Sequence, residues 1–132
     1  MFRALDISTS GLVAQRTRLD AIAGNIANVT TAGKLDGGPA PYSRRMTVFE
    51  PGDGHGGPGV HVAEVVSDPN PPKAVSEPNH PFADANGMVY YPNIDLPTEM
   101  VDAMLAARAY EANVTAIEAT KTMIASTLRI LA

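Results

Sequence analysis

The sequence predicts a mainly α-helical protein: two long N- and C-terminal helices form an antiparallel, coiled-coil-like pair, with a small β-rich, Pro/Gly-rich insert between them. Two observations predict this fold. All 11 prolines of the 132-residue chain lie between Pro39 and Pro97, so both ends are free of the residue that most strongly breaks helices. Both ends also repeat apolar residues every seven positions, as the helices of a coiled coil do. We therefore expect an N-terminal helical part (1–34), an insert (35–94) and a C-terminal helical part (95–132).

The N-terminal helix is predicted from apolar residues at heptad spacing and is expected to be about 24 residues long. It is expected to end near Asn28, because asparagine tolerates the left-handed conformation that closes many helices, and turn-forming residues follow up to Gly33. The seam residues that we expect at a helix interface are Leu5, Leu12, Leu19, Ile22 and Ile26.

The C-terminal helix follows the same period over a longer stretch and is expected to span about 37 residues, or ~55 Å. Asp95 can cap its first turn, where Pro97 loses nothing because the early N–H groups have no partner within the helix. Glu99 and Asp102 suit the positive end of the helix dipole. The seam residues expected at an interface are Met100, Tyr110, Val114, Ile117, Ile124, Leu128 and Leu131.

A second apolar face runs along the C-terminal helix. One partner helix cannot cover two faces, and helices that are apolar on both sides are normally buried all round. We therefore expect burial against other subunits in addition to the pairing of the two terminal helices. A simple coiled-coil dimer is the plainer interpretation of the same pattern. The second face is formed by Val101, Leu105, Met123 and Ile130.

Three short strands are predicted between the helices, at residues 43–49, 60–66 and 88–91, where β-branched and aromatic residues lie between Pro- and Gly-rich turns. Residues 67–86 carry five prolines and are expected to form an extended, loop-like segment that wraps a surface, because each proline fixes φ and removes a hydrogen-bond donor. The insert is thus expected to combine a small β structure with one long irregular segment.

The composition excludes several classes of function. A formal net charge of −4 argues against binding to a phosphate backbone, which needs a clustered basic face, so nucleic acid is not an expected partner. The chain has no cysteine, which removes disulfides, thiolate metal sites and cysteine nucleophiles. Its apolar runs are too short for a direct membrane span, and the first residues lack the apolar stretch expected of a secretory signal peptide.

The motifs that could carry chemistry do not stand in the required context. Gly52, Gly54 and Gly57 fit a G-x-G-x-x-G string, but a strand follows where a nucleotide site needs a helix, so a hairpin loop is the better interpretation. His55 and the two other histidines lack the spacing of zinc motifs, and no arrangement of serine, histidine and carboxylate indicates catalysis. We expect no catalytic residue, no cofactor and no metal site, and hence no enzyme.

A set of short motifs runs from the end of the first helix to the end of the chain. One group consists of Asn25, Ala27, Asn28 and Thr31. The later ones are Gly37-Gly38-Pro39 with Tyr42, Arg44 and Arg45, then His80-Pro81, Tyr91-Pro92-Asn93, Glu99-Met100-Val101, Arg108-Ala109-Tyr110, Ala112-Asn113-Val114 and Lys121. Together they resemble, nearly end to end, the flagellar basal-body rod proteins and within them the short proximal-rod type, the FlgC family. Departures from that family's pattern are Gly24, Ala40-Pro41 and Met88.

The resemblance implies a structural axial subunit of the bacterial flagellar basal-body rod, in its proximal part. Such a subunit polymerises with other rod proteins and with copies of itself into the torque-transmitting drive shaft. The resemblance also implies export through the flagellar type III apparatus without a cleaved signal peptide, contacts with export-apparatus and ring components, and a place in the rod that spans the periplasm.

Two other classes of function stay open on the sequence. Paired helices would also suit a soluble coiled-coil adaptor or a flagellar export chaperone, which would form a discrete oligomer in the cytosol. An enzyme or ligand-binding domain could be built on the β insert, and it would carry a bound metal or cofactor.

Overall fold

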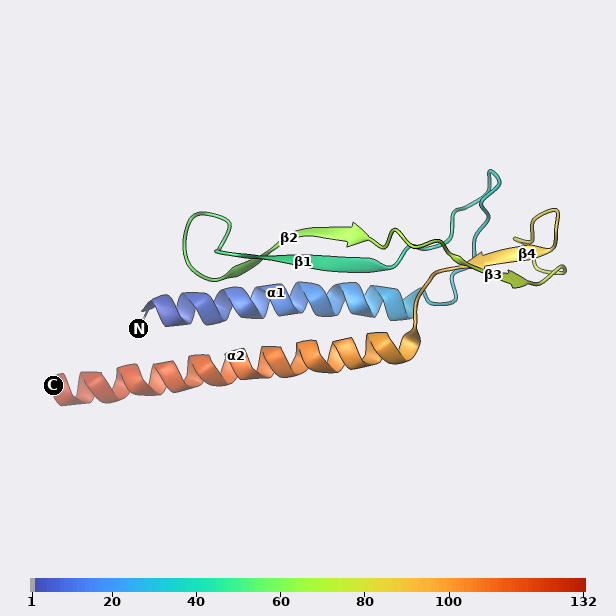
Figure 1. Ribbon diagram of the computed structural model, residues 1–132. Coiled ribbons are helices and arrows are strands. Elements are labelled where there is room, and N and C mark those ends of the chain that lie inside the picture. The colour runs from blue at the N-terminus through green and yellow to red at the C-terminus, as the bar shows by residue number, and fades with distance from the viewer. Residues whose placement is uncertain (1) are drawn as a thin grey trace.

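The computed structural model of this protein describes residues 2–132. Its two long helices, α1 (Phe2–Ala27) and α2 (Leu96–Leu131), run antiparallel and pack side by side (Figure 1). A β-hairpin lies along α1 on the side away from α2, and a second pair of strands lies beyond the end where α1 stops and α2 begins (Figure 1). The molecule is therefore elongated and has three layers, with α1 in the middle.

Local signals in the sequence set the ends of the helices. The Asp95 side chain caps α2 by accepting a hydrogen bond from the Thr98 backbone N–H over 3.2 Å, and Pro97 occupies the first turn. α1 stops one residue before Asn28, whose side-chain amide donates to the Gly24 carbonyl oxygen over 2.8 Å. Two terminal helices with a small β insert between them confirm the predicted order of the elements.

The first two strands form a hairpin. β1 (Arg45–Pro51) and β2 (Val60–Ser67) pair antiparallel and correspond to the first two predicted strands, although β1 begins two residues later than predicted. The Gly-rich stretch between them is the hairpin loop, so that interpretation of the G-x-G-x-x-G string is confirmed. A β-bulge interrupts the ladder between Val48 and Phe49, where the partner strand contributes one extra residue.

The start of β2 is attached directly to α1. The Val60 backbone N–H donates to the Ser10 hydroxyl oxygen over 3.1 Å. The preceding residue, Gly59, has a φ of +132°, and a Cβ placed on it would come within 2.4 Å of the Ser10 hydroxyl oxygen. Only glycine therefore lets the hairpin approach α1 this closely.

The second sheet corrects one sequence prediction. β3 (Lys73–Ser76) lies in the stretch expected to be loop-like throughout, yet it pairs antiparallel with β4 (Met88–Tyr91). Residues 73–77, between Pro72 and Pro78, include no proline, so they keep their backbone N–H groups and can form the hydrogen bonds of a β-ladder. The prediction of a strand at β4 is confirmed.

Few apolar side chains are fully buried in this fold. Many large ones on both helices remain more than one-third exposed, and two of the three bulkiest fully buried side chains are polar, those of Asn25 and Glu99. Much of the apolar surface therefore has no cover from the described part of the chain. The buried apolar residues are Ala14, Ile22, Val89, Ile94 and Ala106.

Candidate functional site

The structure buries the predicted interface residues to different degrees. On α1, Ile22 is 6% exposed and the other four are half-buried: Leu5, Leu12, Leu19 and Ile26. On α2, the half-buried residues are Val114, Ile117 and Ile124, whereas the exposed ones are Met100, Tyr110, Leu128 and Leu131. The predicted seam is thus partly covered within the chain along α1 and between Val114 and Ile124 of α2, and it is open before and after that part of α2.

Two contacts fix the register of α1 against α2. Near the end of α1, the Asn25 side-chain amide donates to Glu99 Oε2 over 3.1 Å. Further back, Gly11 lies against Asn113, and a Cβ at Gly11 would come within 2.8 Å of Asn113 Nδ2, closer than side chains pack. In this register, residues 123–131 of α2 project past the start of α1 (Figure 1), and we call this segment the free end.

At the opposite end of the helix pair, the side chain of Asn25 is buried and makes four hydrogen bonds. Its Nδ2 donates to the Arg45 carbonyl oxygen and its Oδ1 accepts from the Arg45 backbone N–H, each over 2.8 Å. Nδ2 also donates to Glu99, and Oδ1 also accepts from the Tyr42 hydroxyl over 3.2 Å. All four hydrogen-bonding positions of the amide are therefore used, and this one side chain joins α1 to both β1 and α2.

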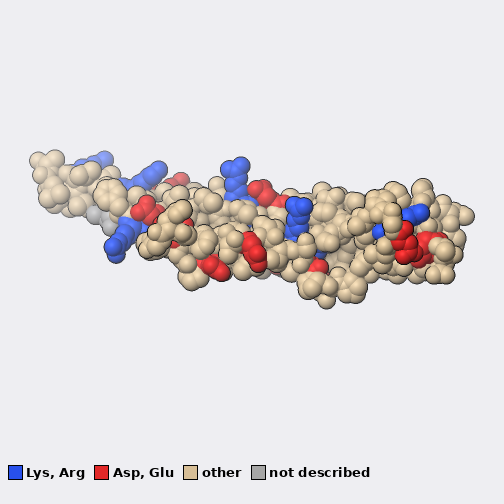
Figure 2. Space-filling model, turned by 90° about the horizontal axis from the view of Figure 1, so that it is seen from above, with Lys and Arg blue, Asp and Glu red and all other residues tan. Residues whose placement is uncertain are grey.

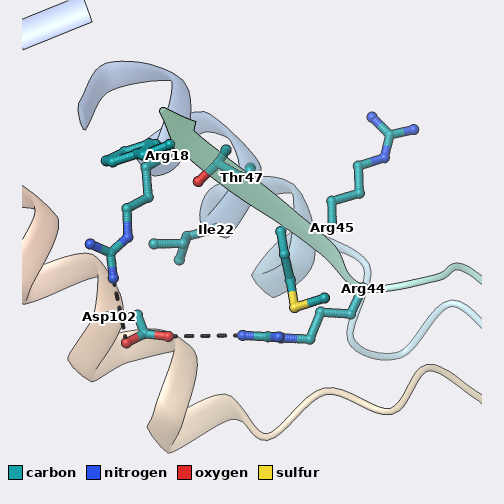
Figure 3. A pocket seen from close by; sticks show the side chains of 9 residues that line it. Arg18, Ile22, Arg44, Arg45, Thr47 and Asp102 are labelled. Carbon is teal, nitrogen blue, oxygen red and sulfur yellow. Dashed lines mark ion pairs between the residues drawn. The ribbon is translucent and has the colours of Figure 1, made fainter. Parts of the chain in front are cut away.

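Glu99 is the buried carboxylate of this region, with 1% of its surface exposed, and Arg44 Nε donates to its Oε1 over 2.5 Å. The same guanidinium lies 3.9 Å from Asp68 and 3.8 Å from Asp102. A hollow of about 330 Å³ lies beside these residues. In Figure 3, Asp102 lies between Arg44 and Arg18 of α1, and the Arg18 guanidinium is 3.8 Å from the Asp102 carboxylate. A carboxylate is buried without a large penalty only when it is paired and hydrogen-bonded, so Arg44 permits the burial of Glu99.

We call Asn25, Arg44, Glu99 and Asp102 the polar junction. The sequence predicted only that Glu99 and Asp102 suit the positive end of the helix dipole. This prediction is incomplete, because Glu99 is buried and accepts a hydrogen bond from Arg44. One signal could have revealed this network. Glu99 lies seven residues before Ala106, which is fully buried, so both residues are on the same face of α2 and a carboxylate on that face needs a partner.

The remaining family-motif residues are at the exit from α1. The Thr31 hydroxyl donates to Asn28 Oδ1 over 3.1 Å, while the Asn28 side-chain amide donates back to the Gly24 carbonyl. Ala27 is exposed. Asn25 thus connects different elements, whereas Asn28 and Thr31 hold the turn that follows the helix.

Asp84 is held in the loop that connects β3 and β4. The Met88 backbone N–H donates to its Oδ1 over 2.9 Å, the Asn86 backbone N–H donates to the same oxygen over 2.8 Å, and the Tyr90 hydroxyl donates to Oδ2 over 3.1 Å. The hydrogen bond from Met88, followed by those from Asn86 and Tyr90, lowers the pKa of Asp84 below its usual value, because each favours the charged carboxylate. This loop is therefore tied to an ionised side chain.

Other groups with possible chemistry are dispersed. Residues 2–132 contain no cluster of three or more His, Asp and Glu side chains that could hold a metal ion, and neither helix in that range is long and apolar enough to cross a membrane. His61 Nδ1 lies 2.9 Å from the Gly52 carbonyl oxygen, and His80 Nδ1 accepts from the Phe82 backbone N–H. Charges of both signs are spread along the face seen in Figure 2.

Comparison with known families gives matches at both ends of the chain. Residues 5–33 match the family described as flagella basal body rod protein, and residues 85–130 match the flagellar basal body rod FlgEFG protein C-terminal family. Several relatives carry the name flagellar basal-body rod protein FlgC. The one from Borreliella burgdorferi is 40% identical over 99% of this chain and 97% of the relative. The relative from Bacillus subtilis is 38% identical over 98% of this chain and 97% of the relative. The relative from Aquifex aeolicus is 42% identical over 92% of this chain and 90% of the relative.

The elongated helix pair, its open apolar faces and the rod-protein matches at both ends together define a structural rod protein. Such a protein is not an enzyme. The identity over nearly the whole length narrows this class: the chain belongs to the FlgC family of flagellar basal-body rod proteins. The resemblance found in the sequence is thereby confirmed.

Proposed function

We propose that this chain is a structural axial subunit in the proximal part of the flagellar basal-body rod, where it polymerises with other rod proteins and with copies of itself. The observation that carries this proposal is the apolar surface that both helices leave uncovered. Phe2 of α1 is 76% exposed and Ile130 of α2 is 85% exposed. Large exposed apolar patches mark contacts with other chains, because burying such surface is the main driving force of association.

The exposed and half-buried apolar residues are proposed to have different roles. Half-buried seam residues such as Leu19 and Ile117 hold α1 and α2 together in a coiled-coil-like pair. Exposed seam residues such as Met100 and Leu128, together with the second apolar face of α2, contact neighbouring subunits. This division supports a subunit that is complete only within an assembly.

We further propose that most of both terminal helices is unfolded in the free chain and becomes ordered when neighbouring subunits cover it. Only five apolar residues of the described chain are buried, which is little to offset the loss of conformational entropy in two long helices. An unfolded chain would also suit export through the narrow type III apparatus without a cleaved signal peptide.

Hydrogen exchange on the purified chain tests this coupling of folding to assembly. Amides at 5–28 and 97–131 are expected to exchange quickly in the free chain and to become protected in rods. Strong protection of both segments in the free chain would contradict the proposal.

Gene deletion followed by electron microscopy tests the rod function. Cells without this chain are expected to lack hooks and filaments and to regain them when the intact gene is returned. Persistence of filaments would refute the rod function. The chain is also expected in purified basal bodies, in the rod that spans the periplasm and next to export-apparatus and ring components. A coiled-coil adaptor or export chaperone would instead be absent from purified basal bodies.

A further inference from the structure

An apolar groove of about 500 Å³ lies between α1 and β2, on the hairpin side of α1. Val13 of α1 and Val65 of β2 line it and remain 63% and 47% exposed, and Ala14, which also lines it, is buried. The groove therefore offers apolar walls on two different elements, and a segment inserted there would be contacted from both sides. A groove of this kind binds a rod-like apolar segment better than a flat surface would.

The free end of α2 is a segment of this kind. Its exposed side chains include Met123, Leu128, Ile130 and Leu131, at 55%, 61%, 85% and 79%. Successive residues of a helix are rotated by about 100°, so these four side chains spread over an arc of about 160° around α2, wider than one narrow stripe. A flat surface would contact only part of this arc, whereas a groove contacts a helix on more than one side.

The charges of the free end and of the groove are complementary. Arg129 is the only charged residue in the sequence from 123 to 131. The groove contributes two carboxylates, those of Asp53 and Glu64, and its other titratable residue, His61, has its Nδ1 beside a backbone carbonyl oxygen. A basic apolar helix end and an acidic apolar groove fit each other by both criteria.

We propose that the free end of one copy of this chain docks into the groove between α1 and β2 of a second copy. This inference rests on the proposed function, since polymerisation brings copies of the chain together. Two different surfaces meet in this contact. A row of copies joined in this way therefore keeps an empty groove at one end and an undocked free end at the other. The contact is therefore heterologous and adds subunits head to tail, which is the geometry that an axial polymer needs.

Because the natural chain has no cysteine, disulfide cross-linking tests this contact directly. The test chain carries both Val13→Cys and Leu128→Cys. It cannot close a disulfide on itself, because residue 128 lies about 25 Å along α2 from the point that faces Val13, and the bond needs Cα atoms within about 7 Å. Oxidation of basal bodies that contain this chain is expected to give a ladder of dimers, trimers and larger species.

The matched control pairs Leu128→Cys with Val75→Cys, since Val75 is an exposed valine of β3 outside the groove. We expect no ladder from this control and at most dimers from chains with a single cysteine. An equal ladder from the control, no ladder from the test chain, or a cross-link to a different protein in its place would overturn the proposal. Loss of filaments on gene deletion together with any of these results would leave the rod function standing.

A charge exchange gives an independent result. Arg129→Glu is expected to lower the yield of the test chain's ladder about two- to fivefold, the effect of one partly exposed ion pair. Adding Glu64→Arg to that chain should restore most of the yield, because the charges are then complementary again. A yield that falls further with the second change would overturn the pairing.

Discussion

The two ends of the helix pair are built in opposite ways. At the polar junction, every hydrogen-bonding position of the Asn25 amide is used and the Glu99 carboxylate is buried against Arg44. At the free end, Leu128 and Ile130 remain 61% and 85% exposed and no part of α1 reaches them. One end is therefore completed by contacts within the chain, whereas the other leaves large apolar side chains exposed.

This contrast indicates how one small chain combines a fixed arrangement with the ability to polymerise. Hydrogen bonds need defined geometry, so the polar junction sets how α1, β1 and α2 are placed relative to one another. Apolar surface is far less directional, so a contact made by the free end would supply association energy without fixing the fold. Four changes test this division. For the first three, the free energy of unfolding is measured on the free chain in the presence of an osmolyte that favours the compact state.

The largest loss of stability is expected for Glu99→Ala. Removing this carboxylate leaves the Arg44 guanidinium partly buried without its closest partner and takes one acceptor from Asn25. Asp68 and Asp102 still lie 3.9 and 3.8 Å from the guanidinium, so the expected cost is at the low end of that for breaking a buried pair, about 3 kcal/mol in the free energy of unfolding, which urea unfolding would measure. Glu118→Ala, at an exposed position of the same helix, is the control and should change the value by less than about 0.5 kcal/mol.

The next largest effect is expected for a charge placed in the seam between the helices. Leu19→Asp or Ile117→Asp puts a charged carboxylate at a half-buried apolar position of the seam, at a cost of about 2–3 kcal/mol. Both variants should fail to assemble rods, and swimming should stop. His55→Ala, in the exposed hairpin loop, should leave swimming near normal. Normal swimming of either aspartate variant would contradict the seam assignment.

A much smaller change in stability is expected for Leu128→Ser at the free end. This side chain is 61% exposed, so the free energy of unfolding of the free chain should change by no more than about 0.5 kcal/mol. Incorporation into basal bodies should nevertheless fall, because the neighbouring subunit loses an apolar contact. A loss of stability as large as that of Ile117→Asp would mean that the free end is covered within its own chain.

The smallest effect is local and depends on pH. Hydrogen bonds, chiefly that from the Met88 backbone N–H, hold the pKa of Asp84 below its usual value. The stabilisation of the β3–β4 loop is therefore fully present above the unfolded-state pKa of about 4, and it is lost as pH falls through the lower folded-state pKa. Amide chemical shifts of Asn86 and Met88 should titrate in this range, and Asp84→Asn should remove the transition.

The features of the fold that were predicted correctly are those set by residues close together in the sequence. The placement of the prolines, the seven-residue period and the Asp95 cap are local features, and they located both helices to within a few residues. β3 was not predicted because it is a short segment between prolines, and it is a strand only because β4, more than ten residues later in the sequence, pairs with it. The burial of Glu99 was missed because it depends on Arg44 and Asn25, which are 55 and 74 residues away in the sequence.

The hairpin is fastened to α1 at two separate points, by the Ser10 hydroxyl at the start of β2 and by the Asn25 amide at the start of β1. These points are about 22 Å apart along the helix. A beam joined to a second member at two distant points resists torsion and bending more than either member does alone, because neither can slide past the other. β1 and β2 thus act as a brace on α1, and loosening either fastening would make each subunit more compliant under load while leaving its length unchanged.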